Sequence, residues 1–255
     1  MKKKLQKILK LFLPYGFIVL QKKYKKHKDN KKKEYVFDAI FSVGDACRPA
    51  YYLKQHDLRL CANPLDWMMS YSLDTVVHLY QSKFNDFFID FIEDQQESHW
   101  FIDIKNNITS IHYKEIGDDN KTFNRKMKKR FMRANKRLLK ASNICFISNR
   151  NENSNVFSDF LNKMGNIYPG KITLINIFYN NEIDGIISPI KHNKKQISER
   201  LELIQYEFND IHPNGNDINS NPNYWIGNVY LWNKIIEQIS IKKNFISYLL
   251  KNYKE

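Results

Sequence analysis

Cys47 is the residue of this sequence whose type and position are best suited to covalent chemistry. It follows an apolar run from Tyr35 to Val43, which predicts a buried strand, and Gly44, which permits a tight turn. The stretch from Cys47 to Leu53 is typical of the opening of a helix, where unpaired N–H groups and a partial positive charge stabilise a thiolate. We therefore predict that Cys47 is a nucleophile with a lowered thiol pKa, and that the same N–H groups hold an oxyanion.

A cysteine nucleophile needs a base, and the seven histidines supply the candidates. His112 differs from the others because it lies in the strand-like sequence ITSIHY, between Ile111 and Tyr113. A strand histidine facing a helix-borne cysteine is the arrangement of cysteine hydrolases, so we predict a Cys47–His112 dyad. A buried cysteine is also a common small apolar residue, and a lone strand histidine is often structural, so the spacing leaves both interpretations open.

Three neighbours of Cys47 in the sequence have a local structural interpretation. Asp45 is suited to cap the helix that follows. Asp66 and Trp67 come directly after the Asn63-Pro64 turn, where they would fix the turn and fill the core. The residue types alone do not separate these tasks from a supporting role beside the thiol.

The remaining cysteines, Cys61 and Cys145, are interpreted as packing residues. Three cysteines without paired spacing argue against a disulfide framework and predict a reducing compartment. No CxxC motif and no Cys/His cluster occurs in the sequence, so we predict no metal site and no cofactor.

The elements that must position these residues follow from hydrophobic periodicity. The clearest helix is 122–141, whose apolar residues recur at steps of three and four: Met127, Phe131, Ala134, Leu138 and Ala141. Nine lysines and arginines occupy other positions from 125 to 140. Further helices are predicted at 66–80, across the phenylalanines of 84–91, at 156–164 and at 230–253. Strands are predicted at 101–105, 109–113, 144–148, 172–178 and 201–208, with a hairpin turn at Asn106-Asn107 and a polar loop at 209–223.

This order of elements predicts the fold class. Strands that alternate with helices indicate an α/β protein with a mostly parallel sheet and helices on both faces. The nucleophile cysteine would then lie at a strand-to-helix turn. We predict that residues 34–255 form a single domain of this kind, preceded by a separate arm of residues 1–33.

The arm carries most of the charge of the chain. Thirteen lysines and Asp29 give residues 1–33 a net charge of 13 − 1 = +12 out of the total of +14, so residues 34–255 carry only +2. This near neutrality argues against nucleic acid as a partner. The apolar run from Leu5 to Leu20 is interrupted by Pro14 and is too short to span a bilayer. We interpret the arm as packing on its own domain or a partner, or as a peripheral anchor on the anionic inner face of the cytoplasmic membrane; both place the protein in the cytoplasm.

The run FDAIFSVGDACRPAYYLKQHDLR followed by NPLDWMMS resembles the opening of a bacterial family of papain-like cysteine peptidases. Its members share a strand, a Ser-x-Gly-x-x-Cys turn, a helix with small and leucine positions, and a Pro-Phe-Asp-Trp-like motif. The matching positions here are Ser42, Gly44, Cys47, Leu53, Pro64, Asp66 and Trp67, and Leu65 replaces the usual phenylalanine. The family's downstream His-Asp-Phe corresponds here to His112-Tyr113-Lys114. The resemblance spans residues 36–180 or so and is most specific in its first thirty-odd positions.

The resemblance implies a papain-like cysteine peptidase, or a related thiol acyl-hydrolase or acyltransferase, acting on a peptide or on an acylated or saccharide substrate. Papain-like enzymes orient the histidine with an Asn or Asp, for which Asp66, Asp103 and Asn149 are the candidates. Members often occur among surface-polysaccharide genes, which implies a role in polysaccharide biosynthesis.

Three other functions stay open at this point. The first is a non-catalytic, membrane-peripheral component of capsule or lipopolysaccharide assembly. The second is a serine-esterase-like sheet, because Gly44-Asp45 is followed by Ala46 where that superfamily has its serine. The third is nucleic-acid binding through the basic helix from Arg125 to Lys140, whose charges are better explained as a solvated face.

Overall fold

The computed structural model describes residues 33–183 and 190–242. The arm predicted for residues 1–33 lies outside the described residues except for its last position, and so does the end of the helix predicted for 230–253.

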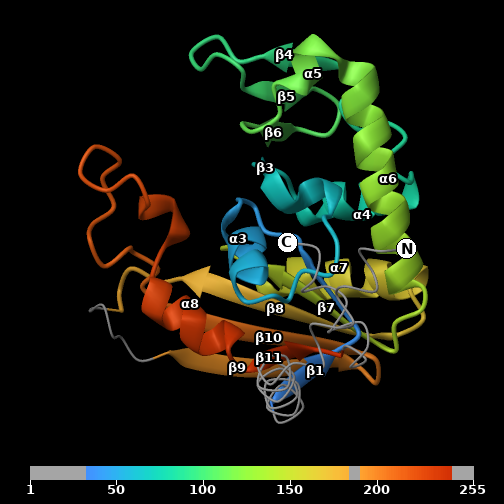
Figure 1. Ribbon diagram of the computed structural model, residues 1–255. Helices are drawn as coiled ribbons and strands as arrows, with labels where there is room; N and C mark the ends of the chain where they lie inside the picture. Colours follow the sequence, from blue (N-terminus) through green and yellow to red (C-terminus); the bar gives the residue numbers. More distant parts are fainter. Residues whose placement is uncertain (1–32, 184–189, 243–255) are drawn as a thin grey trace, which may run out of the picture.

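A five-stranded sheet forms the centre of the described structure (Figure 1). Its strand order is β2-β7-β8-β10-β9, and the first four of these strands are parallel to their neighbours, whereas β9 runs antiparallel along the edge. The strands are β2 (Ala39–Ser42), β7 (Asn143–Ser148), β8 (Lys171–Tyr179), β10 (Leu201–Phe208) and β9 (Lys191–Ser198). The prediction of a mixed α/β fold is confirmed, although the edge strand β9 was missed because its lysine-rich sequence is almost entirely exposed.

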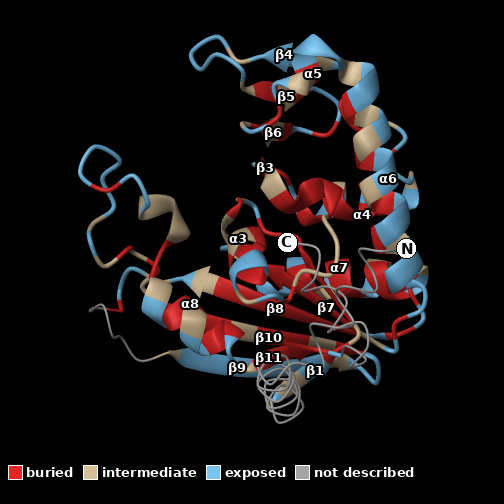
Figure 2. Ribbon diagram, in the orientation of Figure 1, coloured by how far each residue is buried: buried red, intermediate tan, exposed pale blue. Residues whose placement is uncertain are grey.

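Helices cover both faces of this sheet because successive residues of its strands point to opposite sides. Phe146 of β7 belongs to the core shared with α4 (Leu73–Gln81), α6 (Asn120–Leu138) and α7 (Ser154–Ile167). Its neighbour Ile147 belongs to the opposite core, shared with α3 (Arg48–Gln55) and α8 (Val229–Ile236). Figure 2 shows the buried residues gathered in the central strands and in the helix faces against them.

Two smaller sheets complete the architecture. A four-stranded antiparallel sheet, with the order β3-β6-β5-β4, lies beyond α4 at the top of Figure 1. Its strands are β3 (Met68–Met69), β6 (Ile108–Ser110), β5 (Phe101–Asp103) and β4 (Phe91–Glu93), followed by the short α5 (Glu115–Asp118). A parallel pair joins β1 (Tyr35–Phe37) to β11 (Ile239–Ile241). The described chain therefore holds three sheets, one of them wholly antiparallel, where the sequence predicted one mostly parallel sheet.

The long basic helix agrees closely with its prediction. The buried residues of α6 are Phe123, Met127, Phe131, Ala134 and Leu138, spaced by three and four as an amphipathic helix requires. Asp119 caps its first turn by accepting a hydrogen bond from the Thr122 N–H. The helix runs from the small sheet to the central one (Figure 1).

Two predicted helices are wrong, for reasons of backbone geometry. The helix predicted over 66–80 is split, because Ser70 has a φ of 60° and separates β3 from α4. The helix predicted across 84–91 does not form, because Lys83, Phe84 and Phe88 all have positive φ angles. The phenylalanines there still fill the core, but they do so from a series of turns.

Two strand predictions and the C-terminal helix also need correction. The strand predicted from Tyr35 to Val43 breaks at Asp38 into β1 and β2, which belong to different sheets. The hairpin at 101–113 is confirmed, but β6 ends at Ser110 and not at Tyr113. The C-terminal helix ends at Ile236, since the chain turns there to form β11 beside β1.

Candidate active site

Cys47 lies between the end of β2 and the start of α3, at the position that precedes the first helical residue. The apolar strand β2 ends at Ser42, and Pro49 occupies the first turn of α3, where a missing N–H does no harm. The residue is only 6% exposed. Because Pro49 carries no amide hydrogen and Tyr51 donates the first helical hydrogen bond to the Cys47 carbonyl, the N–H groups at the start of α3 that make no helical hydrogen bond are those of Cys47, Arg48 and Ala50.

Gly44 is required by the close approach of two neighbours. A Cβ atom at this position would lie 2.4 Å from Asn149 Oδ1 and 2.5 Å from Pro49 Cγ. Both distances are shorter than any ordinary carbon contact, so no larger residue fits without a shift of the loop. The turn that presents Cys47 is therefore packed directly against the loop after β7.

Buried hydrogen bonds tie the end of β2 to the Pro-Leu-Asp-Trp segment, which forms the short helix η1 (Pro64–Trp67). Asn63 donates from Nδ2 to the Ser42 carbonyl at 3.0 Å. Asp66 Oδ2 accepts from the Asn63 N–H at 2.9 Å and from Arg59 Nη1 at 3.1 Å. Ser42, Asn63 and Asp66 are all buried, so this network fixes the motif as one rigid unit behind the thiol.

Arg150 holds the other side of the same turn. It is 3% exposed, and its guanidinium donates to the Val43 carbonyl at 3.1 Å and to the Tyr71 carbonyl at 2.5 Å. Glu152 compensates its charge at 3.1 Å. The loops after β2, β3 and β7 are thus joined by one buried cation.

His112 approaches Cys47 from the small antiparallel sheet. The distance from Cys47 Sγ to His112 Nε2 is 3.6 Å, across 65 positions of the chain. The histidine lies two residues beyond β6 and is exposed, and Trp67 packs its ring edge-on at 5.6 Å between ring centroids. The structure therefore brings Cys47, His112 and Trp67 together, although His112 lies in a loop and not in the predicted strand.

The ionisation of the pair differs from the prediction. Burial, with a smaller contribution from the Asp66 carboxylate, raises the pKa of the Cys47 thiol to about 11. Desolvation lowers the pKa of His112 below its ordinary value, so the pair rests at neutral pH as a thiol and an uncharged imidazole. The lowered thiol pKa expected from the helix start is wrong, because the cost of burying a thiolate exceeds the stabilisation from one helix terminus.

None of the three candidates for a residue that orients His112 forms a hydrogen bond with its imidazole among the described residues. Asp66 is bound to Asn63 and Arg59 as described above. Asp103 accepts hydrogen bonds from the Phe88 and Asn106 N–H groups, which makes it a turn-forming residue of the small sheet. Asn149 lies against Gly44, and its buried Oδ1 has no hydrogen-bond partner among the described residues. Within the described part of the chain, Cys47 is the hydrogen-bond partner of His112.

Asp45 does not have the capping role that its position indicates. The side chain makes no capping hydrogen bond to α3, whereas its carbonyl accepts from the Ser70 N–H at 3.1 Å. The residue is exposed, and it links the Cys47 turn to the end of β3.

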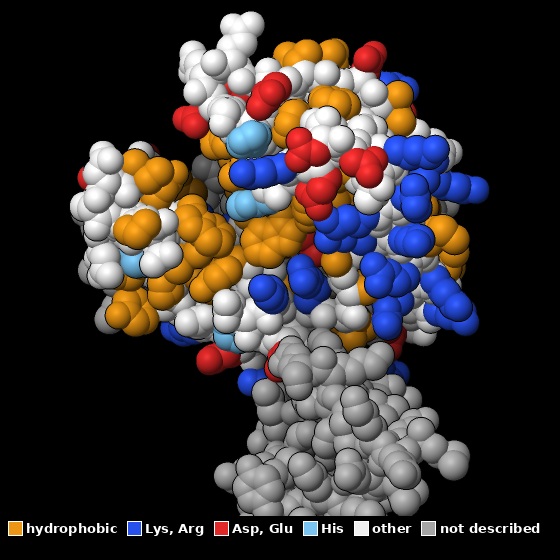
Figure 3. Space-filling model, turned by 45° about the horizontal axis from the view of Figure 1, so that its top comes forward, with side chains coloured by type: hydrophobic (Ala, Val, Ile, Leu, Met, Phe, Trp, Pro, Cys, Tyr) orange, Lys and Arg blue, Asp and Glu red, His pale blue; other side chains and the backbone are white. Residues whose placement is uncertain are grey.

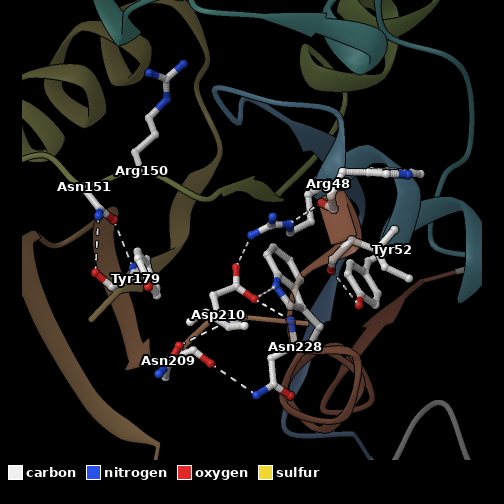
Figure 4. Close-up of polar contacts among 12 residues, drawn as sticks. Arg48, Tyr52, Arg150, Asn151, Tyr179, Asn209, Asp210 and Asn228 are labelled. Atoms are coloured by element: carbon white, nitrogen blue, oxygen red, sulfur yellow. Dashed lines mark hydrogen bonds and ion pairs between the residues drawn. The ribbon is translucent and has the colours of Figure 1, made fainter. Parts of the chain in front are cut away.

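The long loop after β10 is anchored to the helix of Cys47 (Figure 4). Arg48 forms an ion pair with Asp210 and donates from Nε to the Trp225 carbonyl at 2.7 Å. The second carboxylate oxygen of Asp210 accepts from the Asn228 N–H at 2.8 Å and from Trp232 Nε1 at 2.9 Å. The loop predicted at 209–223 is confirmed, and its base is fixed beside the residue that follows Cys47.

Sequence reasoning missed Asn63, Arg150 and Asp210, which hold the site in place. Arg150 and Asp210 each come two residues after a buried strand, β7 or β10. Although β8 separates these two strands, both are parallel strands of the central sheet, so their carboxyl ends lie along the same edge of it, which is a signal that could have found the two residues. Asn63 carries only the signal of a turn residue before proline.

Two searches of the described residues complete the account of the site. No group of three or more His, Cys, Asp or Glu side chains is arranged to hold a metal ion there. None of the helices in that part of the chain combines the length and the apolar character needed to cross a membrane.

The fold and the site define an α/β protein in which a strand-to-helix cysteine meets a histidine from a second sheet. The family described as "putative papain-like cysteine peptidase" matches residues 38–178. This match covers more than half of the chain and includes Cys47 and His112, so the protein belongs to that family. No curated protein and no solved structure matches the chain.

Proposed function

We propose that the protein is a cysteine peptidase, or a closely related thiol acyl-hydrolase or acyltransferase, in which Cys47 is the nucleophile and His112 the base. The observation that carries this proposal is the 3.6 Å approach of Cys47 Sγ to His112 Nε2, between residues that only tertiary structure brings together. Membership of the peptidase family supports a peptide substrate.

The proposed reaction begins with an uncharged pair. Cys47 Sγ attacks the carbonyl carbon of the substrate while His112 Nε2 takes the thiol proton, so no thiolate needs to exist beforehand. The carbonyl oxygen becomes an oxyanion, for which the free N–H groups at the start of α3, those of Cys47, Arg48 and Ala50, are the candidate donors. Collapse of this intermediate breaks the bond to the leaving amine, which receives the proton from His112 and leaves a thioester on Cys47.

A second attack releases the acyl group. Water gives a proton to His112 Nε2 as its oxygen attacks the thioester carbon; when the carbon–sulfur bond then breaks, Cys47 Sγ takes that proton back from His112, which restores the thiol and the neutral imidazole. A sugar hydroxyl in place of water would make the same site an acyltransferase. The two reactions differ only in the acceptor, so the resting geometry serves both.

The proposal is tested by trapping the thioester. The full-length protein is mixed with peptide esters and activated thioesters, quenched in acid, and digested for mass spectrometry. We expect the acyl mass on the peptide that contains Cys47, and its loss in Cys47→Ala but not in Cys61→Ala. Turnover that persists in Cys47→Ala, or an intact protein that forms no adduct with any acyl donor, would favour the non-catalytic alternative.

The pH dependence gives an independent readout. Because desolvation lowers the pKa of His112, its neutral form predominates at pH 7 and is lost as the pH falls through that lowered value. We expect kcat/KM to rise from acidic pH to a plateau below neutrality and to remain there. A rise that continues with the ionisation of the thiol near pH 11 would instead assign the attack to a free thiolate.

The wider role in cell-surface polysaccharide biosynthesis at the inner face of the membrane is a proposal that rests on residues 1–33 and on the family resemblance. Deletion of residues 1–33 followed by cell fractionation tests the membrane part. We expect the shortened protein to leave the membrane fraction, and an unchanged distribution would refute the anchor. Acyl transfer to a surface saccharide, measured with the same thioester donors, tests the substrate part.

A further inference from the structure

A hollow of about 460 Å³ lies beside the last turns of α6, at the other end of β2 from Cys47. Asp38, which directly precedes β2, forms one side, and Cys61 and Ala141 contribute smaller surfaces. Four basic residues supply the rest of the lining: Arg133, Lys136, Arg137 and Lys140. The volume falls within the usual range of small-molecule sites.

The four basic residues lie together because of their spacing around the end of α6. Positions 133, 136 and 137 fall on a single stripe of the last turns of the helix, and Lys140 lies in the turn that directly follows Leu138. This stripe borders the buried one formed by Ala134, Leu138 and Ala141. Figure 3 shows lysine and arginine side chains gathered along this side of the molecule.

These cations differ from others on the same helix in what they contact. Lys126 is paired with Glu115 at 2.9 Å, and Arg130 donates to the Tyr113 hydroxyl at 2.6 Å. No carboxylate of the described residues lies within ion-pair distance of Arg133, Lys136, Arg137 or Lys140. A helix C-terminus accounts for one or two cations through its dipole, but not for four that surround a hollow without an ion-pair partner among the described residues.

The single carboxylate in the hollow is already engaged. Asp38 Oδ2 accepts hydrogen bonds from the Ser142 and Asn143 N–H groups, and Oδ1 lies 3.7 Å from Lys242 Nζ. The described residues of the lining therefore carry four positive charges against one negative charge, although residues 34–255 are close to neutral overall. Like charges held close together favour a bound anion that separates them.

We propose that this hollow, called here the α6 pocket, binds a phosphate group of a small anionic ligand. Two arginines offer planar forks that match phosphate oxygens, and two lysines add mobile charge. A concave site suits a compact phosphate or diphosphate better than a nucleic-acid backbone, which needs basic contacts spread over one long face. The pocket does not involve Cys47 or His112, so this proposal stands independently of the thiol chemistry.

Binding to the full-length protein is measured by isothermal titration calorimetry with inorganic phosphate and with pyrophosphate. A third arm uses flotation with vesicles of phosphatidylcholine, with and without phosphatidic acid, because the phosphate group could belong to a lipid. The pocket variant is Lys136→Gln/Arg137→Gln. The matched control is Lys128→Gln/Lys129→Gln, which removes the same charge from exposed positions of the same helix outside the pocket.

We expect saturable binding that is weakened about tenfold or more in the pocket variant and changed less than about twofold in the control. Asp38→Asn is expected to tighten binding, because it removes the one negative charge of the lining. Binding confined to phosphatidic acid vesicles with this same ranking of variants assigns the phosphate to a lipid. Residues 1–33 are present in every variant and cannot produce that ranking.

Equal weakening by the pocket and control variants would mean diffuse attraction and would overturn the proposal. The absence of saturable binding to all three phosphate probes at millimolar concentration would overturn it too. Cys47→Ala is expected to bind the anion as the unaltered protein does, so failure of the proposed thiol chemistry is distinguished from failure of the pocket. Thermal melting of each variant checks that a loss of binding is not a loss of fold.

Discussion

The two halves of the proposed active site are held in contrasting ways. Cys47 follows a strand of the central sheet, is 6% exposed, and rests on buried residues such as Asn63 and Arg150. His112 follows a three-residue strand of the peripheral sheet, is exposed, and contacts Cys47 and the ring of Trp67. The packing of the core thus fixes the position of the Cys47 thiol, whereas the position of His112 depends on how the small antiparallel sheet packs against that core.

This contrast has a chemical consequence. The surroundings of Cys47 favour the neutral thiol, because burial and the Asp66 carboxylate both raise its pKa. The exposed half supplies a neutral imidazole at physiological pH. Reactivity then depends on the contact between the halves, and not on either residue alone. Substitutions on the two sides should therefore separate effects on chemistry from effects on stability.

Replacing His112 should give the largest effect on activity with the least effect on folding. His112→Ala is expected to lower kcat/KM by about 10²–10⁴-fold, because proton transfer from the Cys47 thiol is lost. The free energy of unfolding should change by less than about 0.5 kcal/mol, since the residue is exposed. Enzyme kinetics and urea unfolding measure the two quantities.

His99→Ala is the matched control for that variant, because His99 is an exposed histidine of the same peripheral region. It should retain full activity and stability. Equal activity of the two variants would show that the approach of Cys47 and His112 has no catalytic role.

Replacing Asp66 tests the buried half through its pH dependence. Burial raises the pKa of Asp66 to about 6, so the folded protein binds this proton more tightly than the unfolded chain. The free energy of unfolding should therefore be higher below pH 4 or so than above pH 6. The loss between these two pH values is on the order of 2–3 kcal/mol. In Asp66→Asn this decline should disappear, which urea unfolding at a series of pH values would show.

The same variant reports on the thiol. Because the Asp66 carboxylate raises the pKa of Cys47, its removal should lower that pKa and speed alkylation of Cys47 by iodoacetamide at a fixed pH. Alkylation of Cys145, which is fully buried, is followed in the same digests as an internal control. If the free energy of unfolding depends on pH in the same way in Asp66→Asn and in the unaltered protein, the assignment of the pKa near 6 to Asp66 is contradicted.

Replacing Gly44 tests how tightly the turn of Cys47 is packed. In Gly44→Ala the new methyl group meets Asn149 Oδ1 and Pro49 Cγ at 2.4 and 2.5 Å, and we expect a loss of about 1–3 kcal/mol in the free energy of unfolding. The double variant with Asn149→Gly should recover part of that loss. Gly215→Ala is the control for crowding. A Cβ there meets nothing within 4 Å, so its φ of +97° leaves backbone strain as the source of any loss in stability.

The sequence predicted the buried half of the site better than the exposed half. The strand, the glycine and the helix start around Cys47 are local signals, and the central strands and α6 were predicted from periodicity. The residues that hold the thiol turn, Asn63, Arg150 and Asp210, depend on contacts between distant segments, which periodicity does not encode. His112 was predicted as the base within a strand, whereas β6 ends at Ser110 and His112 lies in the loop that follows.

The physical reason lies in the small sheet. Its strands have two or three residues each, too few to show the alternation that identifies a strand, and its turns rely on residues with positive φ such as Phe88 and Asn107. Buried phenylalanines in these turns imitate the spacing of a helix. The pairing of β3 with β6, which brings Trp67 and His112 into one region, is set by tertiary contacts and not by local preference.

The smallest effect is expected at the contact that joins the two halves. Trp67 packs edge-on against His112 at 84° between the ring planes, and such contacts contribute about 0.5–1.5 kcal/mol beyond buried area.

In Trp67→Leu we expect kcat/KM to fall by roughly 3–10-fold, because the imidazole samples orientations that do not face the thiol. The pH at which kcat/KM reaches its plateau should move slightly upwards, because burial lowers the pKa of His112 and Trp67 is part of what buries its ring. Trp67→Phe keeps an aromatic ring at the position and should retain most of the activity. If Trp67 only filled space, Phe and Leu would be expected to have similar effects. If both variants lose activity equally, Trp67 acts through the packing of η1, and the small antiparallel sheet alone orients His112.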